Sequence, residues 1–288
     1  MTALEETPQL RTNRVRARDD RAFRVVLWLF GLVLLVFAVV PVLQSVRGHS
    51  LKDYELWQQT GHLVLQGRGI YPDRFHKFDF MYPPSCALLL APVSLLGQTG
   101  LVIVLVVVNA AAWVASIFFS VRLSTGTSRR AAVFVYAVPN AIVLIYVWGN
   151  FLLGQPTLLL LALMLGAFLA LQRRGNVLAG SLIACAAAIK AFPVIAILYL
   201  LYRRYWIAAA SLIISLAFLL VVLPIFARGS AQASTDLQRW VEGMLLKYDE
   251  KGLGQRAGKS NVWKNQSIFG VANRMLRHVD YDDQYAPH

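Results

Sequence analysis

The most constraining feature of this sequence is a series of long runs that contain almost no charged residue. Each run covers about 15 to 26 residues, and a helix needs roughly 20 apolar residues to cross a bilayer. The runs occupy residues 25–46, 101–121, 131–148, 157–171, 177–202 and 206–227. Because 57% of all residues are hydrophobic, most of the chain is incompatible with a soluble domain. The sequence therefore predicts an all-α polytopic membrane protein with roughly 6 to 8 transmembrane helices, some of them short or re-entrant.

The basic residues lie in short clusters between the apolar runs. The formal net charge of +13 would suggest nucleic-acid binding in a soluble protein, but the positive-inside rule explains these clusters without nucleic acid. Arginines precede residue 25 and follow later runs at Arg122, at Arg173 and Arg174, and at Arg203 and Arg204. This pattern predicts a cytoplasmic amino terminus. A signal peptide is the alternative for the first run, but no small-residue cleavage site follows it.

The chain divides into three parts on this basis. Residues 1–24 form a basic cytoplasmic tail, and residues 25–227 form the transmembrane domain, which includes a long outer loop at 47–82. Residues 228–288 form a polar loop or tail. Within the outer loop, an amphipathic pattern that begins near Leu51 predicts a helix lying at the membrane interface.

Spanning is irregular at two places. The run 85–97 after Tyr82-Pro83-Pro84 is short for a membrane crossing. Either it forms a span of its own beside 101–121, or the two runs together make about one crossing. The positive-inside rule favours about one crossing. Lys190 and Pro193 interrupt the run 177–202. This segment is either one span with a lysine in a wet cavity or two half-helices that meet at Lys190, and the helix breaker favours the second.

Cys86 and Cys185 are the two cysteines, and they lie in separate apolar segments. This spacing indicates neither a disulfide framework nor a metal site. We expect both to be small core residues.

Several short motifs recur in the order in which they appear in glycosyltransferase family 87, and between about residues 50 and 274 the chain resembles that family. The motifs are Asp53-Tyr54, the stretch 67–71, Tyr82-Pro83-Pro84 leading to Ala91-Pro92, Gly154-Gln155, Ala188-Ile189-Lys190 with Pro193, and Asn265-Gln266-Ser267. The resemblance implies a GT-C membrane fold that moves a sugar, usually mannose, from a polyprenyl-phosphate carrier to a lipid or glycan acceptor at the outer membrane face. It also implies a bacterial plasma-membrane location.

The family places its catalytic acid in the first outer loop, a position that Asp53 matches, with Glu55 as the alternative. A carboxylate can take the proton of the acceptor hydroxyl in an inverting transfer. A cation at the bilayer edge can stabilise the leaving phosphate; Lys190 is the first candidate and Arg274 the second. Side chains that could hold the substrate by hydrogen bonds are Tyr54, His62, Tyr71, Tyr82, Gln155, Asn265 and Gln266.

The activated phosphate linkage supplies the driving force, so we expect no cofactor and no metal. Asp280-Tyr281-Asp282 has the spacing of a metal-binding motif, but we interpret it as a solvated acidic run in a polar tail. Family members usually continue through further spans after the Asn265 region, so we expect a truncated relative. The alternative function is a transporter or flippase of a polar or lipid-linked solute, in which Asp53 and Lys190 bind without transferring.

Overall fold

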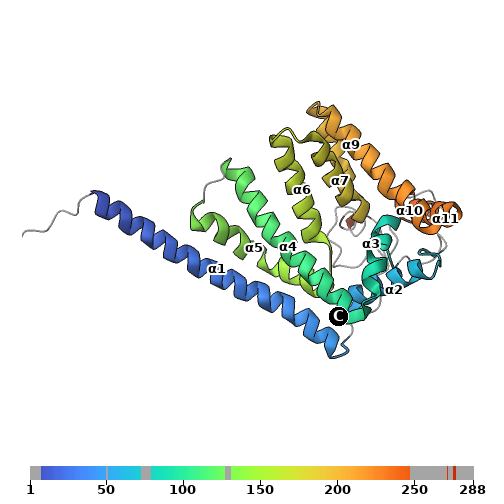
Figure 1. The fold of residues 1–288 in the computed structure, drawn as a ribbon, viewed down its shortest axis with the longest axis horizontal. Helices are drawn as coiled ribbons and strands as arrows, with labels where there is room; N and C mark the ends of the chain where they lie inside the picture. The colour runs from blue at the N-terminus through green and yellow to red at the C-terminus, as the bar shows by residue number, and fades with distance from the viewer. Residues whose placement is uncertain are drawn as a thin grey trace, which may run out of the picture.

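The computed structural model describes residues 8–49, 51–72, 79–126, 131–246, 271, 275 and 276. The described chain is a bundle of helices, most of which run antiparallel to their neighbours (Figure 1). The expectation of an all-α polytopic membrane protein is confirmed. Within the part of the chain that the structure describes, four helical stretches are long and apolar enough to cross a membrane, and they are Asp20–Val46, Gly97–Thr125, Val133–Leu153 and Trp206–Arg228.

The first helix, α1 (Pro8–Val46), begins well before the apolar run, so part of the basic amino-terminal segment continues the first span as a helix. It leads to α2 (Lys52–Leu65), which carries the candidate acids, and then to the short α3 (Pro84–Ser94). Aromatic residues hold α1 to the bundle: the Phe37 ring lies 4.9 Å from Trp148 and 5.9 Å from Phe151, centroid to centroid.

The central helices are α4 (Gly97–Thr125), α5 (Val133–Leu153), α6 (Thr157–Gln172) and α7 (Asn176–Ile189). A 3₁₀ turn (Phe192–Ile195) and α8 (Ala196–Tyr202) then lead the chain back. The last long stretch comprises α9 (Trp206–Ala217), a π-helical turn (Phe218–Val222) and α10 (Leu223–Arg228). It is followed by α11 (Ser230–Trp240) and a second π-helical turn (Val241–Leu245).

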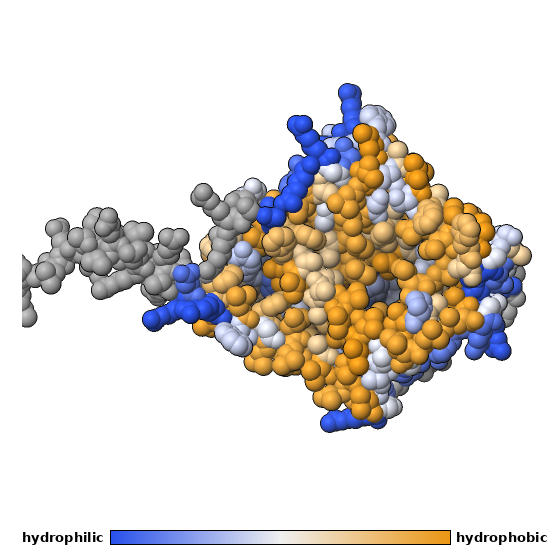
Figure 2. Space-filling model, in the orientation of Figure 1, coloured by the Kyte–Doolittle hydropathy of each residue, from blue (hydrophilic) through white to orange (hydrophobic). Residues whose placement is uncertain are grey.

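The alternating directions of these helices give the bundle two distinct ends. The carboxyl ends of α4, α6 and α8 gather at one end, which we call the arginine end because it carries Arg122, Arg173, Arg174, Arg203 and Arg204. The opposite end, which we call the site end, holds α2, α3, the α5–α6 turn and the break after α7 (Figure 1). Between polar rims, the visible face of the molecule is largely hydrophobic (Figure 2).

The helix boundaries bear on both places where spanning is irregular. At 11 residues, α3 rises only about 16 Å, whereas α4 is long and apolar enough to cross a membrane, which favours about one crossing for the two together. This arrangement keeps Arg122 at the same end as the other arginines. The helix α7 stops at Ile189, and Lys190 adopts an extended conformation with φ −147° and ψ 119°. The interpretation of two half-helices that meet at Lys190 therefore fits the structure.

Close packing of α7 against α9 depends on small side chains. The Cβ of any larger residue at Gly180 would collide with the backbone carbonyl of Ala208, and Ala184 and Ala208 are fully buried. Small residues let two helices approach closely in a membrane, where van der Waals contact is the main source of stability. The cysteine prediction is right for Cys86, which is buried, and wrong for Cys185, which is exposed on the surface of α7.

Candidate functional site

The candidate site begins where α2 docks on the turn between α5 and α6. The Tyr54 hydroxyl donates a hydrogen bond to the carbonyl oxygen of Phe151 at 2.7 Å, and Trp57 Nε1 donates to the carbonyl oxygen of Gly154 at 3.1 Å. In each pair the two residues are 97 positions apart in the sequence. Both hydrogen bonds are buried, so they fix the position of α2 against Gly154, the residue before Gln155.

A glycine makes this close approach possible. Gly154 ends α5 in the left-handed conformation, with φ +66°, and a Cβ there would lie 2.9 Å from the Tyr54 ring. Glycine adopts this conformation without a steric cost and leaves room for the ring. The chain therefore turns sharply into Gln155 directly beneath α2.

Gln155 connects two of the predicted site residues. Its Nε2 donates a hydrogen bond to Asp53 Oδ2, and its Oε1 accepts a hydrogen bond from the Tyr82 hydroxyl at 2.8 Å. Asp53 and Gln155 are partly exposed, whereas Tyr82 is buried. The three side chains form a continuous hydrogen-bonded chain, which we call the Asp53 relay.

Lys190 lies at the far side of this relay. Its Nζ lies 5.6 Å from the centroid of the Tyr82 ring, a cation–π distance. The helix end that carries Lys190 is held to α3, because Ser85 Oγ donates to the carbonyl oxygen of Ala188 at 2.6 Å. A carboxylate and an ammonium group thus face one another across an amide and a phenol.

The loop that supplies Tyr82 is packed with aromatic side chains. The Tyr71 hydroxyl donates to the carbonyl oxygen of Tyr82 at 2.6 Å, and the rings of Trp57 and Tyr82 lie 4.6 Å apart. Burial raises the pKa of Tyr54, Tyr71 and Tyr82 well above the ordinary value for a phenol. Their hydroxyl groups therefore stay protonated at neutral pH and act as hydrogen-bond donors.

The two candidate acids on α2 have different partners. Glu55 Oε1 accepts a hydrogen bond from the Leu51 N–H at 3.2 Å, a contact that stabilises the first turn of its own helix. Asp53 instead contacts Gln155. His62 lies about 13 Å further along the axis of α2 and about half a turn around it, away from the Asp53 relay. Asn265, Gln266, Arg274 and the Asp280-Tyr281-Asp282 run lie outside the described residues.

A second group of polar residues was missed by the sequence analysis. Arg228 Nε lies 3.1 Å from Asp236 Oδ2, and both side chains are almost completely buried. Asp236 Oδ1 also accepts a hydrogen bond from the Ile70 N–H at 3.2 Å. Burial raises the pKa of Asp236, and the Ile70 N–H and Arg228 oppose that rise. A lone aspartate in a polar segment gives no sequence signal that its partner is an arginine at the end of the preceding helix.

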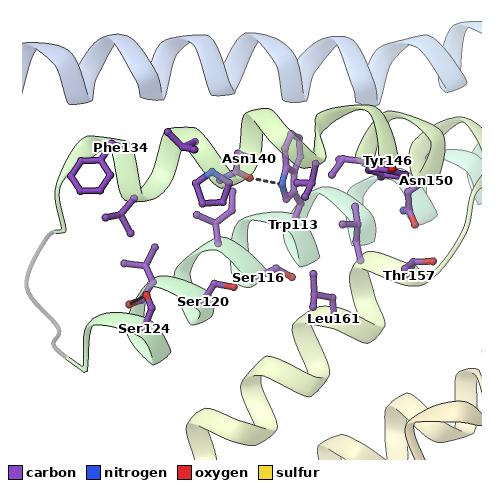
Figure 3. Close-up of a pocket in the computed structure, with 18 residues that line it drawn as sticks. Trp113, Ser116, Ser120, Ser124, Phe134, Asn140, Tyr146, Asn150, Thr157 and Leu161 are labelled. Carbon is purple, nitrogen blue, oxygen red and sulfur yellow. Dashed lines mark hydrogen bonds between the residues drawn. The ribbon is translucent and has the colours of Figure 1, made fainter.

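A large groove lies apart from the relay, between α4, α5 and α6 (Figure 3). Its cavity volume is about 710 Å³, and its walls are mostly apolar, with Ser116, Ser120 and Asn140 among the polar exceptions. Asn140 Oδ1 accepts a hydrogen bond from Trp113 Nε1 at 3.0 Å. Only its end, at Asn150 and Thr157, approaches the α5–α6 turn, so we centre the candidate site on the relay.

Comparisons with known proteins agree with the resemblance seen in the motifs. The model of glycosyltransferase family 87 matches residues 80–287. The matched region includes Tyr82, Gln155 and Lys190 and begins after α2, so Asp53 lies outside it. No curated protein and no solved structure matched the chain.

Proposed function

The chain belongs to glycosyltransferase family 87 and is a membrane glycosyltransferase, and we propose that it transfers mannose from a polyprenyl-phosphate donor to a lipid or glycan acceptor. The observation that carries the proposal is the contact between Asp53 and Gln155 within the Asp53 relay, with Lys190 next to Tyr82 at its far side. Together with Lys190, the relay draws on four segments that lie far apart in the sequence. Asp53 can take a proton and Lys190 can bind a phosphate, which are the two functions that a transfer from a phosphate carrier needs.

In the proposed reaction Asp53 is the general base. The acceptor hydroxyl oxygen attacks the anomeric carbon, the bond from that carbon to the phosphate oxygen breaks, and Asp53 takes the hydroxyl proton. Attack from the face opposite the leaving group inverts the configuration at the anomeric carbon. Gln155 holds the Asp53 carboxylate by donating to Oδ2, which leaves Oδ1 to accept the proton.

Lys190 is proposed to bind the donor phosphate. Negative charge grows on the phosphate as the anomeric bond breaks, and a fixed cation nearby lowers the energy of that transition state. The extended backbone at Lys190 and the bond from Ser85 to Ala188 support a fixed position for this residue. The donor linkage supplies the driving force, so the proposed reaction uses neither a cofactor nor a metal.

We propose further that the arginine end faces the cytoplasm and that the site end faces the outside of a bacterial plasma membrane. Arg122 lies in the last helical turn of α4, and Arg173, Arg174, Arg203 and Arg204 lie in the turns after α6 and α8, all at the arginine end. Short basic turns of this kind are retained on the cytoplasmic side during insertion. The relay then lies at the outer membrane surface, where a lipid-linked donor can present its sugar.

The test is a pair of matched substitutions on α2, Asp53→Asn and Glu55→Gln. Each removes one carboxylate with little change of shape, and both residues are partly exposed. Membranes that contain each variant receive radiolabelled polyprenyl-phosphate mannose, and labelled acceptor is measured after variant abundance and membrane insertion have been matched. We expect Asp53→Asn to lower transfer by about 10² to 10⁴-fold, the usual contribution of a general base. Glu55→Gln should retain most of the activity, and full activity in Asp53→Asn would contradict the proposal.

A further inference from the structure

A buried ion pair joins α10 to α11 outside the Asp53 relay. Gly229, with φ +78°, separates the two helices and folds α11 back, so that Asp236 lies beside Arg228. The pair is 3.1 Å apart, and the side chains are 2% and 1% exposed. A buried pair of this kind contributes little net stability compared with apolar residues of similar size, but removing one partner alone is costly.

The polar groups around this pair are directed at the backbone of the outer loop. Asp236 Oδ1 accepts the Ile70 N–H at 3.2 Å, and Arg228 Nη2 donates a short hydrogen bond to the carbonyl oxygen of Arg68. One turn further along α11, Arg239 Nη1 donates to the carbonyl oxygen of Tyr71 at 3.1 Å. One side of α10 and α11 therefore holds residues 68–71 by main-chain contacts.

The same helix also reaches the second part of the loop. Trp240 Nε1 donates to the carbonyl oxygen of Met81 at 3.3 Å. The held residue Tyr71 in turn donates from its hydroxyl to the carbonyl oxygen of Tyr82 at 2.6 Å. Tyr82 is the residue that donates to Gln155 and lies beneath Lys190. The contacts thus run without a break from the buried ion pair to the relay.

We propose that the Arg228–Asp236 pair is the centre of a latch by which α10 and α11 position Tyr82, and through it Gln155, for catalysis. Arg228 and Asp236 are positioning residues, since they reach the relay through the loop backbone. The predicted effect of the latch on sugar transfer rests on the proposed function. Its predicted effect on the loop depends on the fold alone. An orientation error of about 1 Å at a catalytic group can lower a rate about 10²-fold, so loosening the loop should lower kcat.

The main test uses the double variant Arg228→Met/Asp236→Leu in the full chain. This variant removes both charges together and so leaves no uncompensated buried charge, but it also removes the groups that bind Ile70 and Arg68. Gln238→Ala is the matched control, because Gln238 donates to Glu242 on the exposed side of the same helix. The conservative variant Arg228→Lys keeps a positive charge beside Asp236 but loses the guanidinium group. It tests whether the charge alone is enough to hold the loop.

The first measurement is hydrogen–deuterium exchange of the purified proteins in detergent micelles. The latch predicts that amide exchange in residues 68–72 and 79–83 accelerates by about tenfold or more in the double variant, with little change in α4 to α7. Arg228→Lys should give an intermediate acceleration, and Gln238→Ala should give none. Unchanged exchange in the loop of the double variant would overturn the proposal. A uniform acceleration across the bundle would also overturn it, since the pair would then support the whole fold.

The second measurement is the steady-state rate of transfer from polyprenyl-phosphate mannose. The latch predicts that kcat falls by about 10 to 100-fold in the double variant while KM for the donor changes less than about threefold. A raised KM with unchanged kcat would overturn the positioning role. If the wild-type chain transfers no mannose, the proposed function fails, and the exchange measurement still decides whether the latch holds the loop.

Discussion

Replacing Gly154 with alanine should destabilise the protein substantially, because two effects combine at that position. The backbone has φ +66°, and a Cβ would lie 2.9 Å from two atoms of the buried Tyr54 ring. The left-handed conformation costs an alanine about 1 to 2 kcal/mol. Overpacking against a fixed ring typically costs about 1 to 3 kcal/mol.

One effect acts in the opposite direction. Alanine restricts the unfolded chain more than glycine does, which stabilises the folded state by about 0.4 to 1 kcal/mol. The net loss for Gly154→Ala is therefore about 1 to 5 kcal/mol of unfolding free energy. The Tyr54 ring cannot give way easily, since its hydroxyl is bonded to Phe151.

Gly149→Ala is the matched control on the same helix. Nothing lies within 4 Å of a Cβ built at Gly149, and its backbone is helical. Alanine there should leave stability unchanged or raise it by about 0.5 to 1 kcal/mol. Both variants can be compared by SDS titration in mixed micelles, with tryptophan fluorescence as the signal. Unfolding of Gly154→Ala at the same SDS fraction as Gly149→Ala would show that neither the backbone conformation nor the Tyr54 ring opposes a side chain at position 154.

Three further predictions concern other parts of the site and the bundle. Lys190→Met should lower sugar transfer by about 10²-fold, as expected for the loss of a charge that stabilises a leaving group. Lys190→Arg should keep more activity than Lys190→Met in the radiolabel assay. Equal activities in the two variants would argue against a contact between Lys190 and the phosphate. Gly180→Ala should destabilise the fold by about 1 to 3 kcal/mol in the SDS titration, because its Cβ collides with the Ala208 carbonyl; wild-type stability would show that α9 can move away. Burial raises the folded-state pKa of Tyr71 and Tyr82, so the stability that their buried hydroxyl groups contribute is complete below the unfolded-state pKa of about 10 and is lost as the pH rises above it. Tyr71→Phe should therefore lessen the loss of unfolding free energy between about pH 9 and about pH 11. An unchanged loss would count against a buried phenol at position 71.

The spans could be predicted from the sequence because each depends on a local property. A long run without charge, such as 101–121, must be helical and must be buried in lipid or protein, whatever its neighbours are. The break at Lys190 was equally local, since a lysine and a following proline both oppose a continuous apolar helix. The number of crossings near α3 needed the structure, because 11 residues can lie at the surface or begin a span.

The contacts of the site could be predicted only in part. The order of the motifs selected Asp53, Gln155 and Lys190 as candidates, but nothing local says that Gln155 bonds to Asp53 and not to Glu55. That choice depends on the left-handed turn at Gly154 and on the way Tyr54 and Trp57 seat α2 against it.

The Arg228–Asp236 pair was missed for a related reason. A sequence shows that both residues are charged but not that a turn at Gly229 buries them together. Long-range burial of this kind depends on the packing of the outer loop against α11, which has no local pattern.

We propose that this membrane protein forms a covalent glycosidic product and that Asp53 is required for it. The most direct measurement supplies radiolabelled polyprenyl-phosphate mannose and a membrane lipid extract to the purified chain in liposomes, and identifies the labelled products. We expect label in a new mannosylated acceptor with inverted anomeric configuration, and its loss in Asp53→Asn. Label that crosses the vesicle membrane while still attached to polyprenyl phosphate, with no acceptor product, would instead identify the protein as a transporter of the lipid-linked sugar.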